Sequence, residues 1–175
     1  MKVRWAMEWW IFVIIVIFGV AGFIEYRRVP LVKAWSIRHG VNVTTSCDMD
    51  MQLQSEILSD VAPYGASGGW GFGLILTREM MAARLRISEC RMRLNRGTAW
   101  HVVCSVTIDG IVDEAVLRDR LPKSVANREV VIGKHGVVWR RRSLLWPKRL
   151  DAIYAEAEEV REAIITASHG KQHNS

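Results

Sequence analysis

The sequence predicts an α+β protein: a single N-terminal transmembrane helix, then a small soluble domain. In that domain two β-hairpins form an antiparallel sheet that packs against a short helix and a C-terminal amphipathic helix. An uncharged apolar run near the N-terminus, two pairs of strand-like segments and a final helical pattern predict this fold class. The 175 residues, half of them hydrophobic, suffice for one domain with a core and exclude a disordered chain or a collagen-like fibre.

The apolar run near the N-terminus predicts a membrane anchor. Residues 9–24 carry no charge, and the run reaches back to Trp5 with Glu8 as its interruption. Twenty helical residues rise about 30 Å, which matches the hydrocarbon core of a bilayer. Aromatic and basic side chains flank the run, as they do at membrane interfaces. The predicted membrane-interface residues are Trp5, Trp9, Trp10, Tyr26, Arg27 and Arg28.

A cleaved signal peptide is the alternative for this segment, with Lys2 and Arg4 as its basic start and a small-residue site at Val20-Ala21-Gly22. The tryptophans before the run and the two arginines after it favour the anchor. More cations follow the run than precede it, so the positive-inside rule predicts a cytoplasmic C-terminal domain. The layout resembles that of many single-pass bacterial proteins, which implies a bacterial inner membrane.

Composition divides the chain into four parts, which are a tail and anchor (1–28), a juxtamembrane linker region with a short helix (29–68), the soluble α+β domain (69–168) and a disordered tail (169–175). Pro30 is expected to break or kink the membrane helix, because proline lacks an N–H and restricts the residue before it. Within the linker region, residues 51–62 have helical spacing. The glycine-rich residues 63–73 are expected to form a flexible loop.

The first hairpin is predicted from two alternating runs, 84–94 and 99–108, separated by a turn signal at Gly97. A three-residue loop is expected, because it sets apolar side chains opposite one another. The expected pairs are Leu94 with Trp100, Met92 with Val102 and Cys90 with Cys104. A two-residue loop is rejected, because it sets charged side chains opposite the same apolar face.

The second hairpin is predicted from residues 129–132 and 137–141, with Lys134-His135 as a two-residue loop. This loop pairs Ile132 with Val137, Val130 with Trp139, Val131 with Val138 and Glu129 with Arg140.

Two helices complete the predicted domain. The first is a short helix over residues 113–121. The other starts at Trp146-Pro147 and carries apolar residues at spacings of three and four. These residues are Leu150, Ile153, Tyr154, Ala157, Val160 and Ile164.

No pattern with a catalytic mechanism occurs in the chain. It lacks a CxxC pair, a GxSxG elbow, a Walker loop and a dinucleotide fingerprint. We therefore predict no catalytic residue, no metal site and no small-molecule cofactor. A thiol-dependent enzyme that uses Cys47 or Cys104 with a histidine is kept as the less favoured alternative.

Basic and aromatic residues are the remaining candidates for binding. An arginine-rich patch for an anionic partner is predicted at Arg140, Arg141, Arg142, Lys148 and Arg149, and partner contacts are predicted at Trp35, Trp70, Phe72 and Trp146. The tryptophans are equally candidates for the core.

The anchor and the absence of a catalytic motif favour a non-enzymatic, membrane-anchored interaction protein, an accessory or assembly subunit of a membrane complex. Its expected partners are the lipid bilayer and other membrane or membrane-associated proteins. A peripheral module that binds anionic lipid or nucleic acid through the arginine-rich patch is the alternative. No known nucleic-acid-binding module supports the nucleic-acid version.

Overall fold

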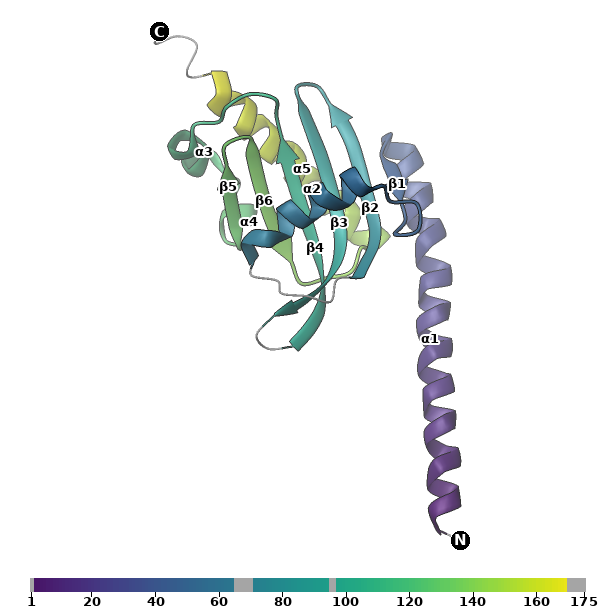
Figure 1. The fold of residues 1–175 in the computed structure, drawn as a ribbon. Helices are drawn as coiled ribbons and strands as arrows, with labels where there is room; N and C mark the ends of the chain where they lie inside the picture. Colours follow the sequence, from purple (N-terminus) through teal and green to yellow (C-terminus); the bar gives the residue numbers. More distant parts are fainter. Residues whose placement is uncertain (1, 65–70, 95–96, 170–175) are drawn as a thin grey trace.

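A six-stranded antiparallel sheet forms the centre of the protein, with helices on both of its faces (Figure 1). The structure, a computed structural model, describes residues 2–64, 71–94 and 97–169. The strand order is β1-β2-β3-β4-β6-β5. The strands are β1 (Asn42–Thr44), β2 (Gly71–Met80), β3 (Ala83–Leu94), β4 (Gly97–Thr107), β5 (Val130–Gly133) and β6 (Gly136–Arg141). The helices are α1 (Lys2–His39), α2 (Met51–Val61), η1 (Ala62–Tyr64), α3 (Glu114–Arg120), α4 (Lys123–Ala126) and α5 (Pro147–His169). The predicted α+β class is confirmed, and β1 and β2 extend the sheet beyond the two expected hairpins.

The alternation of side chains along the strands divides the core into two clusters. The larger cluster lies between the sheet and α5, and α3 and α4 each add one buried side chain to it, Leu117 and Val125. The smaller cluster lies between α2 and the opposite face, where Ile57 and Val61 pack on the sheet. Figure 1 shows the sheet between α2 on one side and α5 on the other.

The helix α1 is continuous, and its last third belongs to the body. Val32 and Trp35 are buried in the larger cluster, while residues 9–24 extend away from the sheet (Figure 1). The helix continues through Pro30 rather than ending there. A proline inside a helix removes one hydrogen bond, and the packing of the turns that follow compensates for this loss.

Residues expected to form a linker also belong to the body. The strand β1 pairs with β2, with Val43 opposite Leu76, and α2 covers one face of the sheet as the helical spacing of residues 51–62 predicted. Asp50 caps α2 by accepting a hydrogen bond from the backbone N–H of Leu53. Most of the expected flexible loop, at residues 65–70, and the expected tail from residue 170 lie outside the described residues.

The second hairpin and the final helix are confirmed. The strands β5 and β6 pair Val130 with Trp139 and Ile132 with Val137, in the predicted register. Glu129 and Arg140 form the expected ion pair. In α5 the predicted apolar stripe faces the core, and all its members are buried except the half-buried Tyr154.

The predicted register of the first hairpin is wrong. The strands β3 and β4 pair Glu89 with Val102 and Ile87 with Cys104, and Leu94 stands opposite Gly97. The prediction excluded charged residues from the apolar face. That argument failed because Glu89 lies on this face, where Arg28 of α1 neutralises its charge.

Candidate functional site

The described residues of the body leave the apolar part of α1 uncovered. Trp9, Trp10 and Phe18 are all exposed, Phe18 by 73%. Among the described residues α1 is the one helix long and apolar enough to cross a membrane, by length and composition. So large an exposed apolar surface suits lipid or other apolar helices better than water. The side chain of Trp5 lies outside the described residues.

A buried ion pair attaches α1 to the body just after the apolar segment of the helix. Arg28 is 2% exposed and Glu89 is fully buried. The guanidinium donates from Nη1 to Glu89 Oε1 at 2.6 Å and from Nη2 to Oε2 at 3.1 Å. Nη1 also donates to the Leu145 carbonyl at 3.1 Å, and Glu25 accepts from Nη2 at the outer side. This bidentate arrangement fixes the rotation of α1 relative to the sheet.

The carboxylate of Glu89 also satisfies two backbone amides. It accepts from the Leu74 N–H at 3.2 Å and from the Leu145 N–H at 2.9 Å. The Leu74 amide is available because the β2–β3 register shifts between Phe72 and Ile75, so two residues of β2 stand opposite Glu89. Charge-assisted hydrogen bonds of this kind stabilise a buried carboxylate.

Gly73 makes room for this carboxylate. A Cβ at position 73 would lie 2.0 Å from Glu89 Oε2 and 2.8 Å from its Cδ. Any larger residue would therefore displace the ion pair. The junction thus joins four segments, which are α1, the bulge in β2, the strand β3 and the loop before α5.

A second contact holds the end of α1 against α5. The Trp35 indole N–H donates to Asp151 Oδ1 at 2.7 Å. The His39 ring stacks on Trp35 at 4.2 Å, and the Tyr154 ring meets Trp35 edge-on at 5.7 Å. These contacts place Trp35 in the core, which corrects its predicted role as a partner contact.

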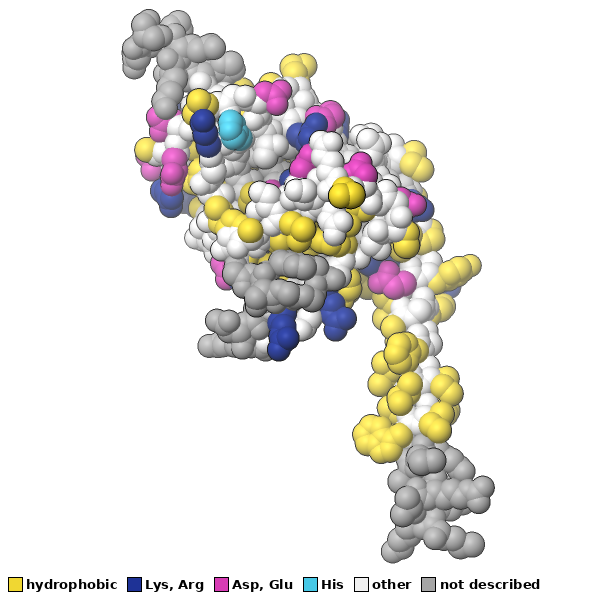
Figure 2. Space-filling model, viewed as in Figure 1, with side chains coloured by type: hydrophobic (Ala, Val, Ile, Leu, Met, Phe, Trp, Pro, Cys, Tyr) yellow, Lys and Arg dark blue, Asp and Glu magenta, His cyan; other side chains and the backbone are white. Residues whose placement is uncertain are grey.

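Cations gather at the end of the body where α1 leaves. Leu145 contacts Arg28, so the loop after β6 and the first turn of α5 lie at this end, and β3 reaches it after Glu89. Exposed basic side chains occupy all these segments. They are Arg27, Arg91, Arg93, Arg142, Lys148 and Arg149. Figure 2 shows Lys and Arg side chains at the lower end of the body, on the side toward which the apolar helix extends.

The predicted arginine-rich patch is therefore divided. Arg140 pairs with Glu129 and lies over the Tyr64 ring at 4.9 Å, and Arg141 lies 3.5 Å from Glu156. The other three members, Arg142, Lys148 and Arg149, are exposed.

The remaining predicted site residues have mixed surroundings. Among the interface residues, Tyr26 and Arg27 are exposed, but Arg28 is buried and cannot contact headgroups. Phe72 packs on the smaller core cluster, and Trp146 is 37% exposed. Trp70 lies outside the described residues.

Two of the three cysteines are buried in the core. Cys90 and Cys104 are free thiols that lie in different core clusters, on opposite faces of the sheet, and Cys47 is exposed. Burial raises the pKa of both the Cys90 and the Cys104 thiol to about 12. A buried neutral thiol behaves as a small apolar side chain, so this geometry gives no support to thiol catalysis.

His101 is the one buried histidine among the described residues, and it stands opposite Cys90. Neither of its ring nitrogens has a hydrogen-bond partner among those residues. Burial lowers the pKa of His101, and the charges of Arg140 and Arg142 lower it further, while Glu129 opposes them. Folding therefore favours the neutral imidazole over the charged one, relative to the unfolded chain.

We expect His101 to lower the free energy of unfolding in acid. Its folded pKa lies below the unfolded value of about 6.5, so stability is lost as the pH falls from there toward the folded pKa. His101→Leu should remove this part of the pH dependence and cost little at about pH 7.5, because it removes an unpaired polar group. Unfolding of both proteins, measured at about pH 7.5 and about pH 5, checks this. An equal loss of stability in both would contradict it.

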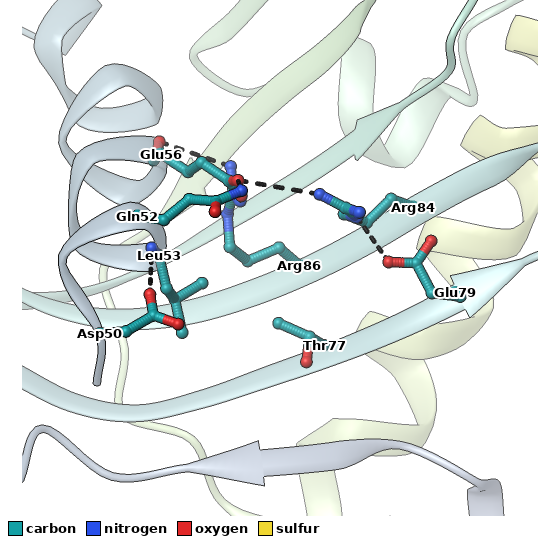
Figure 3. A pocket seen from close by; sticks show the side chains of 8 residues that line it. All are labelled: Asp50, Gln52, Leu53, Glu56, Thr77, Glu79, Arg84 and Arg86. Atoms are coloured by element: carbon teal, nitrogen blue, oxygen red, sulfur yellow. Dashed lines mark hydrogen bonds and ion pairs between the residues drawn. The ribbon is translucent and has the colours of Figure 1, made fainter. Parts of the chain in front are cut away.

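A shallow groove of about 260 Å³ lies between α2 and the strands β2 and β3 (Figure 3). Its cations are already paired: Arg86 donates to Asp60 at 2.6 Å and also pairs with Glu56, and Arg84 donates to Glu79 at 2.6 Å. These pairs attach α2 to the sheet and leave no cation in the groove free for an anionic ligand. Among the described residues, no group of three or more His, Cys, Asp or Glu side chains is arranged to hold a metal.

Sequence reasoning missed Glu89 and Gly73. A glutamate inside an otherwise alternating strand and a GxG in the preceding strand were the available signals, and neither one indicates a partner on a distant helix.

No family model, no curated protein and no solved structure matches this chain.

Proposed function

We propose that this chain is a non-enzymatic single-pass membrane protein that presents its α+β body at a fixed orientation as an accessory or assembly subunit of a membrane complex. The observation that carries the proposal is the buried junction between Arg28 and Glu89. It makes the end of the apolar helix part of the folded core.

The continuity of α1 supports this proposal. From Trp9 to His39 there is one helix, with no loop between the apolar segment and the part that packs on α5. Movement of the apolar segment is therefore transmitted to the sheet. A fixed orientation of the body is what a subunit that meets a partner in the same membrane requires.

The outward face of α1 offers a surface for that partner. Tyr26 and Ile37 lie about 20° apart around the helix, on its side away from the core, and Leu31 lies on a flank; all three are exposed, Ile37 by 80%. They continue the apolar surface of the membrane helix beyond the bilayer. We further propose that the body lies on the cytoplasmic side of an inner membrane, since the cations at the helix exit favour that side.

The anchor and the partner are tested separately in native membranes. Carbonate washing at alkaline pH should leave the full chain in the membrane pellet. A photoreactive residue at Leu31 or Ile37 should then yield protein adducts in those membranes. The matched control is Met81, exposed at the opposite end of the sheet, which should yield none.

Release of the intact chain by carbonate would overturn the anchor. Retention in the pellet without adducts at either helix position, together with migration as a monomer on native gels, would overturn the role as a subunit.

A further inference from the structure

We propose that the end of the body from which α1 leaves is a binding surface for anionic phospholipid headgroups, with the β3–β4 hairpin as its deepest part. The proposal rests on the anchoring by α1 proposed above and adds a second, sequence-distant contact with the same leaflet.

The reach of the hairpin is the first argument. The strand β3 continues five residues beyond Glu89 to Leu94, about 16 Å at strand rise. From Arg28, which binds Glu89, back to Ile24 the helix covers only about 6 Å. Figure 1 shows the hairpin and the N-terminal part of α1 extending from the body in the same direction. The strand slants away from α1 in Figure 1, so the hairpin comes to the level of the headgroup layer when α1 tilts toward it, and anionic headgroups favour that tilt.

The charge at this end is the second argument. The hairpin carries the exposed Arg91 and Arg93, and Arg142, Lys148 and Arg149 lie on the neighbouring loop and first turn of α5. Glu25 lies at the helix exit and pairs with Arg28, which also pairs with Glu89, so these three residues together leave one negative charge against the five cations. Basic clusters next to a membrane helix are attracted to anionic lipid within about 10 Å of the surface.

The opposite end of the body has a different charge pattern. There the exposed Arg118 pairs with Glu114, and Arg84 pairs with Glu79. Acidic and basic side chains are interspersed over this end, so it has no comparable attraction for an anionic surface.

Aromatic residues accompany the cations. Trp100 stands opposite Arg91 at the base of the hairpin tip and is half-buried, and Trp146 is 37% exposed beside Lys148. Indole rings partition into the interfacial layer of bilayers, next to snorkelling cations. The mixture of cations and indole rings at this end is thus typical of a surface that contacts lipid headgroups.

The experiment uses the full chain with Cys47→Ser and a nitroxide label on Thr98→Cys, in nanodiscs of phosphatidylcholine alone or of an equal mixture with phosphatidylglycerol. Collisions of the label with a water-soluble nickel chelate are measured. They should fall severalfold in the mixed nanodiscs and recover in high salt. In Arg91→Gln/Arg93→Gln the fall should be lost. The matched control, Arg118→Gln/Arg120→Gln at the opposite end, should behave as the parent protein.

A second label, on Phe18→Cys, separates failure of this inference from failure of the anchor. If Phe18 reports the lipid interior and Thr98 stays accessible to the chelate in both lipids, the inference is overturned and the anchor stands. Equal shielding of Thr98 in both lipids would also overturn it. Binding of a DNA duplex that is lost in the Arg91/Arg93 variant, without any lipid dependence, would assign the surface to nucleic acid instead.

Discussion

Glu89→Gln is expected to destabilise the folded protein by about 3–5 kcal/mol, the cost of leaving one member of a buried ion pair without its partner. Arg28 would keep Glu25, whose side chain is half exposed, as its one charged partner, together with the Leu145 carbonyl. The amide of glutamine also brings a donor into a position where each hydrogen-bond partner of Glu89 is itself a donor. Denaturant unfolding in detergent micelles, followed by tryptophan fluorescence, measures the loss.

The control for this change is Glu79→Gln. Glu79 pairs with Arg84 in an arrangement of the same chemistry at the surface, so its loss should cost no more than about 1 kcal/mol. Equal effects of the two substitutions would show that the buried pair contributes nothing beyond an exposed one.

Partial recovery is expected in Arg28→Met/Glu89→Gln. This pair of changes removes the uncompensated charge, while the glutamine oxygen still accepts from the Leu74 or the Leu145 amide. The double variant should be more stable than Glu89→Gln alone, because buried ion pairs can be replaced by neutral groups at little cost. A double variant less stable than either single one would contradict this account.

Gly73→Ala is expected to have the second large effect. Its Cβ would meet the Glu89 carboxylate at 2.0 Å, so the carboxylate must move away from Arg28. Overpacking costs about 1–3 kcal/mol, and part of the ion-pair energy is lost in addition. Gly133→Ala is the control, because its nearest neighbour would lie at 3.8 Å.

A double-mutant cycle identifies the cause of the Gly73 effect. In a Glu89→Ala background the obstructing carboxylate is absent, so adding Gly73→Ala should cost much less than it does in the parent protein. Additive costs would instead place the requirement for glycine in the backbone of the bulge. The same unfolding measurement serves all four proteins.

The second hairpin shows where sequence reasoning suffices. The apolar pairs across β5 and β6, such as Ile132 with Val137, are chemically matched, and so is the ion pair of Arg140 with Glu129, which precedes β5. The turn is two residues long and the partners are close in sequence. Local information therefore determines the register.

The first hairpin shows where it fails. The choice between registers depended on whether Glu89 could face the core, and Arg28, the residue that allows this, is 61 positions away. A buried charge is acceptable only with its partner in place, and no periodicity in β3 reveals that partner. The role of Gly73 was missed for the same reason. Glycine is required at position 73 because the Glu89 carboxylate occupies the space of a side chain there, and nothing in β2 itself indicates this.

By itself, the sequence determined the α+β class, the long apolar helix, the second hairpin and the apolar face of α5, because each follows from periodicity and short-range pairing. Only the tertiary structure decided the path of α1 into the core, the register of β3 on β4 and the gathering of cations at the helix exit. Those features depend on contacts between distant segments, in which a buried charge is compensated or a helix end is packed. Such compensation is a property of the folded arrangement and leaves no local pattern in the chain.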